Sequence, residues 1–145
     1  MKVSIYVLAA LALLSVGCAS VPRASADRDA VAKRFEVAPG KANLYVFRDE
    51  TYGGSWAASV LLDGRLLGDT VHHTFVFVQI EPGPHKIMSK AENDSDLAFT
   101  AEAGKNHYVF QNMHMGVWRA RATLHLVDEQ RGRSGVNACE LIQSP

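Results

Sequence analysis

Met113, His114 and Met115 stand in a row and are the side chains of this 145-residue chain that most resemble a metal site. Two thioethers and an imidazole suit Cu(I). Successive side chains of a β-strand point to opposite faces, however, so a strand over 107 to 115 places both methionines on one face and His114 on the other. His107 shares the methionine face but lies about 20 Å along such a strand from Met113. We therefore expect the methionines to pack in a core, His114 to be exposed and no copper to bind.

The remaining His and acidic residues predict no metal site either. His72 and His73 are adjacent, so on a strand they point to opposite faces, and no Cys pair or close His spacing supplies further zinc ligands. Asp94 and Asp96 lie in a polar stretch, but the twelve-residue calcium pattern that ends in Glu is missing. Asx turns explain these two residues better. We predict no metal and no cofactor.

Sequence patterns typical of catalytic sites are also missing. The chain has no G-x-S-x-G elbow and no phosphate-binding glycine loop. Asp128-Glu129 with Arg131 and Arg133 is interpreted as a charged turn, with an electrostatic contact to a partner or to lipid headgroups as the alternative. Trp56 and Trp118 are candidates for binding, because an exposed Trp often contacts a protein or a sugar, although in so small a domain Trp is usually in the core. We predict no catalytic residue.

The first residues have the order of blocks typical of a secretory signal. Lys2 is followed by an apolar run over 3 to 14, then by small residues and Cys18. The run is shorter than the roughly 20 apolar residues of a membrane-spanning helix. The segment resembles a bacterial lipoprotein signal, in which the peptidase cuts before a Cys that has received a diacylglycerol. The resemblance implies that Cys18 becomes the acylated N-terminus, and Ala19 in place of Asp after it favours the outer membrane.

These features divide the chain into a signal peptide (1–17), a lipid-anchored tether (18–40) and one β domain (41–145). If Cys18 is acylated, Cys139 has no partner within the chain, and it is either buried as a small apolar residue or available to another molecule.

The 15 Lys and Arg balance the 15 Asp and Glu. This balance argues against nucleic acid as a partner, because phosphate binding needs a clustered basic excess.

The body of the chain predicts short strands separated by turns. Asp63-Gly64 is a hairpin signal, because both central residues of that turn need positive φ. Pro82-Gly83 fits a type II turn that returns the next strand as a partner. A short helix is expected between Asp27 and Phe35, and a helical turn within 134 to 142. Strands are expected at 43–48, 56–62, 65–67, 74–80, 85–89, 97–101, 107–115 and 121–129.

This pattern predicts an all-β fold, a small antiparallel β-sandwich or partly closed barrel of seven or eight strands. Several segments of the chain carry a further signal through their order and spacing. They are 41–48, 62–64, 67–68, 81–85, 103–105, Gln111, 115–118, 126–129 and Cys139. Taken together, they resemble the lipoprotein family called domain of unknown function 2846. The resemblance implies a proteobacterial origin, a lipid anchor and a small β domain, and it carries over no catalytic residue. His107 departs from the pattern, which has an aromatic residue there.

The function expected from these features is that of a non-enzymatic envelope lipoprotein. The Cys18 lipid is expected to hold it at the periplasmic face of the outer membrane. Its β domain is expected to bind another envelope protein or a glycan. The alternative is a periplasmic metal-binding protein or hydrolase that uses His and acidic residues on loops.

Overall fold

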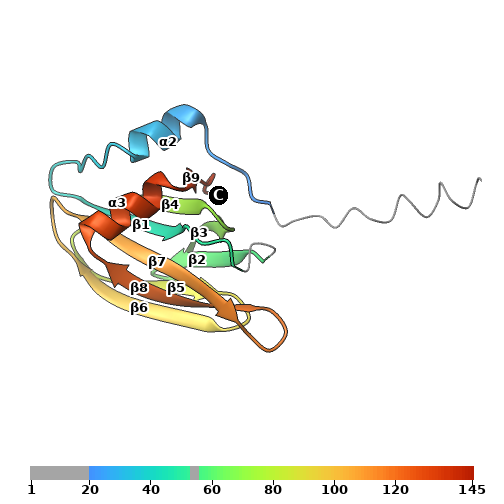
Figure 1. Cartoon of the computed structure of the whole chain (residues 1–145). Helices are drawn as coiled ribbons and strands as arrows, with labels where there is room; N and C mark the ends of the chain where they lie inside the picture. Colours follow the sequence, from blue (N-terminus) through green and yellow to red (C-terminus); the bar gives the residue numbers. More distant parts are fainter. Residues whose placement is uncertain (1–19, 53–55) are drawn as a thin grey trace, which may run out of the picture.

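The computed structural model describes residues 20–52 and 56–145 (Figure 1). The expected signal peptide (1–17) and the expected lipid-bearing Cys18 lie outside the described residues. Within the described ranges, no helix is both long and apolar enough to cross a membrane.

The described chain contains nine strands and two short helices, and the expected strands are confirmed to within a few residues at their ends. The helices are α2 (Ala26–Ala32) and α3 (Glu129–Asn137). The strands are β1 (Ala42–Arg48), β2 (Ala58–Leu62), β3 (Arg65–Thr70), β4 (Thr74–Ile80), β5 (Gly83–Lys90), β6 (Asp94–Ala101), β7 (Asn106–Met115), β8 (Ala120–Val127) and β9 (Glu140–Leu141).

The strands form two sheets, and the predicted β-sandwich is confirmed. The five-stranded sheet has the order β8-β7-β1-β4-β9 and the four-stranded sheet the order β3-β2-β5-β6. Most neighbouring strands pair antiparallel, as predicted, and two pairs, β1 with β7 and β4 with β9, are parallel. Between β1 and β7 the chain crosses to the other sheet and back twice, through β2 and β3 and then through β5 and β6. Parallel neighbours require such long connections.

The two predicted turns have different roles. Asp63 (φ 50°) and Gly64 (φ 84°) join β2 to β3 in the expected hairpin. The turn at Pro82-Gly83 does not form a hairpin, because β5 pairs with β2 and β6 instead of β4. In its own sheet β4 is flanked on both sides, by β1 and β9. The chain therefore crosses from one sheet to the other at this turn.

Two apolar cores lie on opposite faces of the five-stranded sheet. The first fills the space between the sheets, with Val46, Val60 and Ile87 fully buried. The second lies between the sheet and the two helices and is rich in aromatic rings, with Tyr45 and Tyr108 stacked at 5.3 Å between ring centroids. All seven residues of β1 are buried as a result. Figure 1 shows both helices on the same outer side of this sheet.

The segment expected to be a tether packs on the domain in its described part. Val21 packs against the core between the sheets, and the backbone N–H of Ala24 donates to the carbonyl of Leu141 at 2.9 Å. The expected short helix is α2, which begins at Ala26 with Ser25 as its N-cap, close to the expected start at Asp27. The Tyr45 hydroxyl donates to the carbonyl of Ala32 at 2.8 Å. The segment packs on the domain because Ala32 and Phe35 cover the aromatic core. A free tether would leave that core exposed to solvent.

Helix α3 replaces the charged turn expected at Asp128-Glu129. Asp128 is its N-cap, and the Asp128 carboxylate accepts the N–H of Arg131 at 2.8 Å. Two glycines let this helix lie close to the sheet: a Cβ on Gly132 would come within 2.1 Å of Tyr108, and one on Gly135 within 2.1 Å of Phe47. The helix covers the aromatic core, so tertiary packing outweighs the low helix propensity of glycine.

Candidate functional site

The turn between β7 and β8, residues 116–119, is held in shape by one carboxylate from the opposite sheet. Glu92 lies in the turn between β5 and β6. Its carboxylate accepts the backbone N–H groups of Val117 at 2.8 Å, Trp118 at 2.6 Å and Arg119 at 2.6 Å. The guanidinium of Arg121 adds a fourth bond at 3.0 Å. These donors lower the pKa of Glu92 to about 2.

The local sequence allows the β7–β8 turn to close around this carboxylate. A Cβ on Gly116 would meet the carbonyl oxygen of Arg119 at 2.2 Å and the Glu92 carboxylate at 2.8 Å, so only glycine fits there. Asn93, next to Glu92, bonds both backbone groups of Ala122 at 2.9 Å. The β5–β6 turn therefore holds the β7–β8 turn through a set of side-chain to backbone hydrogen bonds.

Large apolar side chains gather on and beside this turn. Trp118 is 87% exposed, Met115 76% and Val117 70%. Trp56 is also exposed, and the guanidinium of Arg119 lies 6.0 Å from its ring centre. Tyr52 is exposed as well, and its carbonyl oxygen lies 3.5 Å from the guanidinium of Arg48, which also bonds Trp56. We call Tyr52, Trp56, Met115, Val117 and Trp118 the aromatic end. It contains five of the eight large apolar residues that are exposed in the described chain.

A buried polar layer lies beneath the aromatic end. Arg48, at the end of β1, is fully buried, and its guanidinium donates to the carbonyl oxygens of Trp56 at 2.9 Å and Thr70 at 3.3 Å. Burial lowers the pKa of Arg48 to about 10, which leaves it charged at neutral pH. The side chain of Gln111 links Thr70 at 2.5 Å to Ser89 at 2.6 Å. These bonds join β1 and β7 of one sheet to β3 and β5 of the other.

Two acidic residues after β1 complete this support. Asp49 accepts two bonds from the guanidinium of Arg131, at 2.6 and 2.9 Å, and Arg131 also lies 4.9 Å from the ring centre of Phe47. The Glu50 carboxylate accepts the backbone N–H of Met113. Arg131, for which a partner or lipid contact was the alternative interpretation, is thus engaged in an ion pair within the domain.

At the opposite end of the sandwich the turns are charged and paired with one another. Lys41 pairs with Glu81, and Lys105 with Glu102. His85 bonds the Asp63 carboxylate at 2.6 Å through Nδ1. Burial alone would lower the pKa of His85, but the bonds to Asp63 and to the Glu81 carbonyl outweigh it and raise that pKa. We call Lys41, Asp63, Glu81, His85, Glu102 and Lys105 the charged end.

The Met and His residues of β7 are separated, as alternation predicts. Met113 packs with Ala58 and Ala122 in a small core and is 3% exposed. Met115 does not pack as expected, because it stands at the last position of β7, beyond the reach of the core. His114 is partly buried, where full exposure was expected. His107 lies near the charged end, and its Nε2 accepts the N–H of Glu102 at 3.0 Å.

Strand alternation does not apply to His72 and His73, which lie in the turn between β3 and β4. His73 has φ 54°, and the two rings meet at 5.7 Å between centroids. They line a polar pocket with Arg23, Lys33 and the chain around Cys139. Across residues 20–52 and 56–145, no three His, Cys, Asp or Glu side chains are grouped as metal ligands.

The other acidic candidates are part of regular elements. Asp94 is the first residue of β6, and Asp96, on the same strand, pairs with Lys86 at 2.9 Å, so both lie on a strand and not in the expected Asx turns. Their backbone pairs with β5, which explains why the polar stretch is extended. In α3, Glu129 pairs with Arg133 four residues later at 2.7 Å.

Cys139 is buried, which is one of the two alternatives that the sequence leaves open. It is 2% exposed, and its thiol donates to the carbonyl of Arg48 at 3.5 Å. Burial raises its pKa to about 12, so at neutral pH it is an unreactive thiol.

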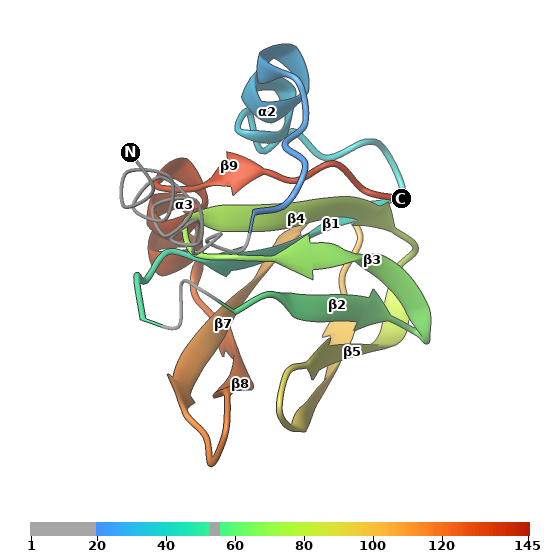
Figure 2. The ribbon, with the colours of Figure 1, turned by 90° about the vertical axis from the view of Figure 1, so that its right-hand side faces the viewer.

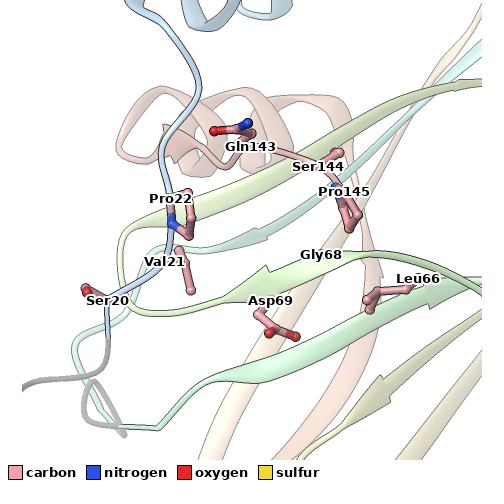
Figure 3. Close-up of a pocket in the computed structure, with 9 residues that line it drawn as sticks. All are labelled: Ser20, Val21, Pro22, Leu66, Gly68, Asp69, Gln143, Ser144 and Pro145. Carbon is pink, nitrogen blue, oxygen red and sulfur yellow. The ribbon is translucent and has the colours of Figure 1, made fainter.

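The first described residues border an open pocket that Figure 3 shows in close-up. Ser20 and Val21 approach β3 near Asp69, and the C-terminal residues close the other side. The N-terminal segment is fixed here by the bond from the Gln143 N–H to the carbonyl of Pro22 at 2.9 Å. The residues around the pocket are Ser20, Val21, Pro22, Leu66, Gly68, Asp69, Gln143, Ser144 and Pro145.

Glu92 and Arg48, the two residues that support the aromatic end, were not predicted from the sequence. Arg48 is the last residue of the mostly apolar strand β1. A charged residue at the end of a buried strand indicates a side chain that is buried and hydrogen-bonded, so Arg48 could have been singled out. Glu92 carried no comparable signal, because its partners lie 25 to 29 residues away along the chain.

Comparison with known proteins gives two matches. The family described as protein of unknown function (DUF2846) matches residues 38–123. An uncharacterized protein of Haemophilus influenzae is 33% identical over 137 residues, which covers 92% of this chain and 81% of that protein.

Proposed function

The chain belongs to the DUF2846 family of proteins of unknown function, and on that premise we propose that it is a non-enzymatic envelope lipoprotein that acts by binding. In this proposal Cys18 carries the lipid, of the palmitate type, and the protein lies at the periplasmic face of the outer membrane. The β domain binds another component of the envelope, and the sequence favours a protein or a glycan as that component.

The observation that carries the proposal is that Trp118 is exposed on a turn whose backbone is fixed by hydrogen bonds. A side chain of this size that is 87% exposed offers a large apolar contact area. The turn that bears it is held by three backbone bonds to Glu92, so little conformational freedom remains to be lost on binding. A preformed surface with an exposed Trp is typical of a binding hot spot.

Two features of the sequence and structure support the lipid anchor. A charged residue, an apolar run and small residues precede Cys18. Ser20, only two positions later, already lines a pocket with Asp69 of β3. A lipid on Cys18 would therefore hold the domain close to the bilayer.

The anchor is tested by replacing Cys18 with Ala in the full-length gene. We expect Cys18→Ala to abolish lipid attachment and to move the protein from the membrane fraction to the soluble fraction. Intact-mass measurement of the wild-type protein should show a chain that begins at Cys18 with acyl groups. Cys139→Ala is the matched control, and it should keep both the mass increase and the membrane attachment. An unmodified Cys18, or a Cys18→Ala protein that stays equally bound, would contradict the proposal.

Binding is tested by chemical crosslinking in native membranes followed by identification of the captured molecules. A partner that is captured by wild-type protein and lost in Trp118→Ala supports binding through this surface. Turnover of a substrate by the purified protein would contradict the non-enzymatic role.

A further inference from the structure

The exposed apolar side chains of this domain are unevenly distributed. The aromatic end holds Tyr52, Trp56, Met115, Val117 and Trp118, whereas the turns of the charged end are covered by ion pairs. Tyr and Trp are the side chains that concentrate where a protein meets the interfacial region of a bilayer. Arg119, which lies beside Trp56, adds a cation suited to lipid phosphate.

The point where the described chain begins lies on the same side of the molecule. Ser20 lines a pocket with Asp69 of β3. The residue after Asp69 is Thr70, and the Arg48 guanidinium donates to the carbonyl oxygens of both Thr70 and Trp56. These contacts connect the start of the described chain to the aromatic end. In Figure 1 the start of the described chain and the tip of the β7–β8 hairpin both lie on the right-hand side. Figure 2 looks onto that side of the molecule.

The length of chain between Cys18 and the domain is short. Ser20 follows Cys18 by two positions, and an extended chain spans at most about 7 Å over two residues. A lipid on Cys18 therefore brings this side of the domain to the bilayer surface, whichever way the intervening chain runs.

The Glu92 carboxylate, which reaches into the β7–β8 turn, is fully bonded within the domain. The Glu92 carboxylate binds three backbone N–H groups and the Arg121 guanidinium, and its side chain is 14% exposed. Its charge is thus balanced within the turn. Anionic headgroups would meet Trp118, Val117 and Arg119 in place of an exposed carboxylate.

We infer that the aromatic end docks on the bilayer that holds the Cys18 lipid, with Trp118 and Val117 entering its interfacial region. This inference rests on the proposed lipid anchor and names the partner of the exposed tip. Docking in this orientation turns the charged end away from the membrane.

The test uses the full-length lipoprotein, purified from membranes and reconstituted in vesicles of phosphatidylethanolamine and phosphatidylglycerol. Trp56→Phe leaves Trp118 as the single Trp. Lipids with brominated acyl chains quench Trp fluorescence at short range. We expect the Trp118 emission to shift to shorter wavelength on reconstitution and to lose most of its intensity in brominated vesicles.

The matched control moves the single Trp to another exposed apolar position. Leu126, near the far end of β8, is 48% exposed. In the triple variant Trp56→Phe, Trp118→Phe and Leu126→Trp, we expect emission at the wavelength of a hydrated Trp and no quenching by brominated lipid. Intact mass is measured for both samples, so that the state of Cys18 is known in each.

The outcomes separate the inference from the proposed function. Quenching of Trp118 in Trp56→Phe, without quenching in the triple variant, supports docking. If Cys18 carries its lipid and Trp118 is not quenched, docking is overturned and the lipoprotein proposal stands. If Cys18 carries no lipid, the proposed anchor fails and the inference fails with it. A photo-crosslinker at position 118 that captures a protein or glycan from native membranes, and not lipid, also overturns docking.

Discussion

The aromatic end and the charged end use their carboxylates in opposite ways. At the charged end Glu81 and Glu102 pair with lysines on the surface, and such exposed pairs contribute little to stability. At the aromatic end the Glu92 carboxylate binds backbone N–H groups, while Trp118, Val117 and Met115 remain exposed. Because a carboxylate from the opposite sheet organises the backbone of this turn, the exposure of these apolar groups is a property of the folded domain. It is not the result of a loose loop.

The comparison predicts that the support beneath the aromatic end matters most for stability. Arg48→Ala removes the buried donor of the Trp56 and Thr70 carbonyls and leaves a cavity. We expect a loss on the order of 3 kcal/mol in the free energy of unfolding, measured by chemical denaturation. Arg65→Ala, at the exposed start of β3, is the control and should change it by no more than about 0.5 kcal/mol. Equal effects of the two variants would show that Arg48 does not organise this region.

A second prediction concerns the turn itself. Glu92→Gln keeps the shape of the side chain but loses the charge that strengthens its bonds to the 117–119 backbone. We expect hydrogen exchange of these three amides to become faster by on the order of tenfold, because weaker bonds make local opening of the turn less costly. Exchange in β1 should be unchanged.

The control for this variant lies at the charged end. Glu102→Gln removes a carboxylate that pairs with the Lys105 side chain on the surface. It should leave the amides of 117–119 as they are in the wild-type protein. If Glu92→Gln leaves them unchanged as well, the turn is held by other contacts.

The pH dependence of the turn follows from the direction of the Glu92 pKa shift. Its pKa is lowered from 4.5 to about 2 by the N–H groups of Val117, Trp118 and Arg119. A lowered pKa means that the stabilisation is fully present above the ordinary value and is lost as the pH falls through the folded value. The NMR signals of these amides should therefore stay constant down to the ordinary value and move only near pH 2. Movement centred at the ordinary value would contradict the observed bonds.

The smallest expected effect is at the charged end. The pKa of Asp63 is lowered, chiefly by its bond to His85, and the pKa of His85 is raised by the Asp63 and Glu81 bonds against the effect of burial. The Asp63 contribution is lost as the pH falls through its lowered pKa, and the His85 contribution as the pH rises through its raised pKa. The pair is thus complete between these two values.

Asp63→Asn should lower the pKa of His85, which an NMR titration of the imidazole protons measures. Asp96→Asn, which removes the partner of Lys86, is the control and should leave that titration in place. An unchanged His85 pKa in Asp63→Asn would show that the Glu81 carbonyl alone holds the imidazole.

Most of the strands and one hairpin could be predicted from the sequence. β4 (Thr74–Ile80) was located at its observed bounds, because alternation of side chains along a strand is a local property of the chain. The Asp63-Gly64 hairpin was predicted for the same reason, since positive φ is a preference of these two residues themselves. The separation of Met113 from His114 needed no more than this alternation.

The tertiary structure decided what these local preferences leave open. Helix α3 contains Gly132 and Gly135, which disfavour a helix in isolation, yet the missing side chains let it approach Phe47 and Tyr108. Whether Trp118 is core or surface depends on where the hairpin ends relative to the opposite sheet, and Glu92 contributes from 26 residues away. Alternation and turn preference act between near neighbours, whereas the burial of a helix and the support of a turn depend on contacts between distant segments. For that reason the sequence by itself determined the strands, and only the folded chain determined which end of the sandwich exposes its aromatic residues.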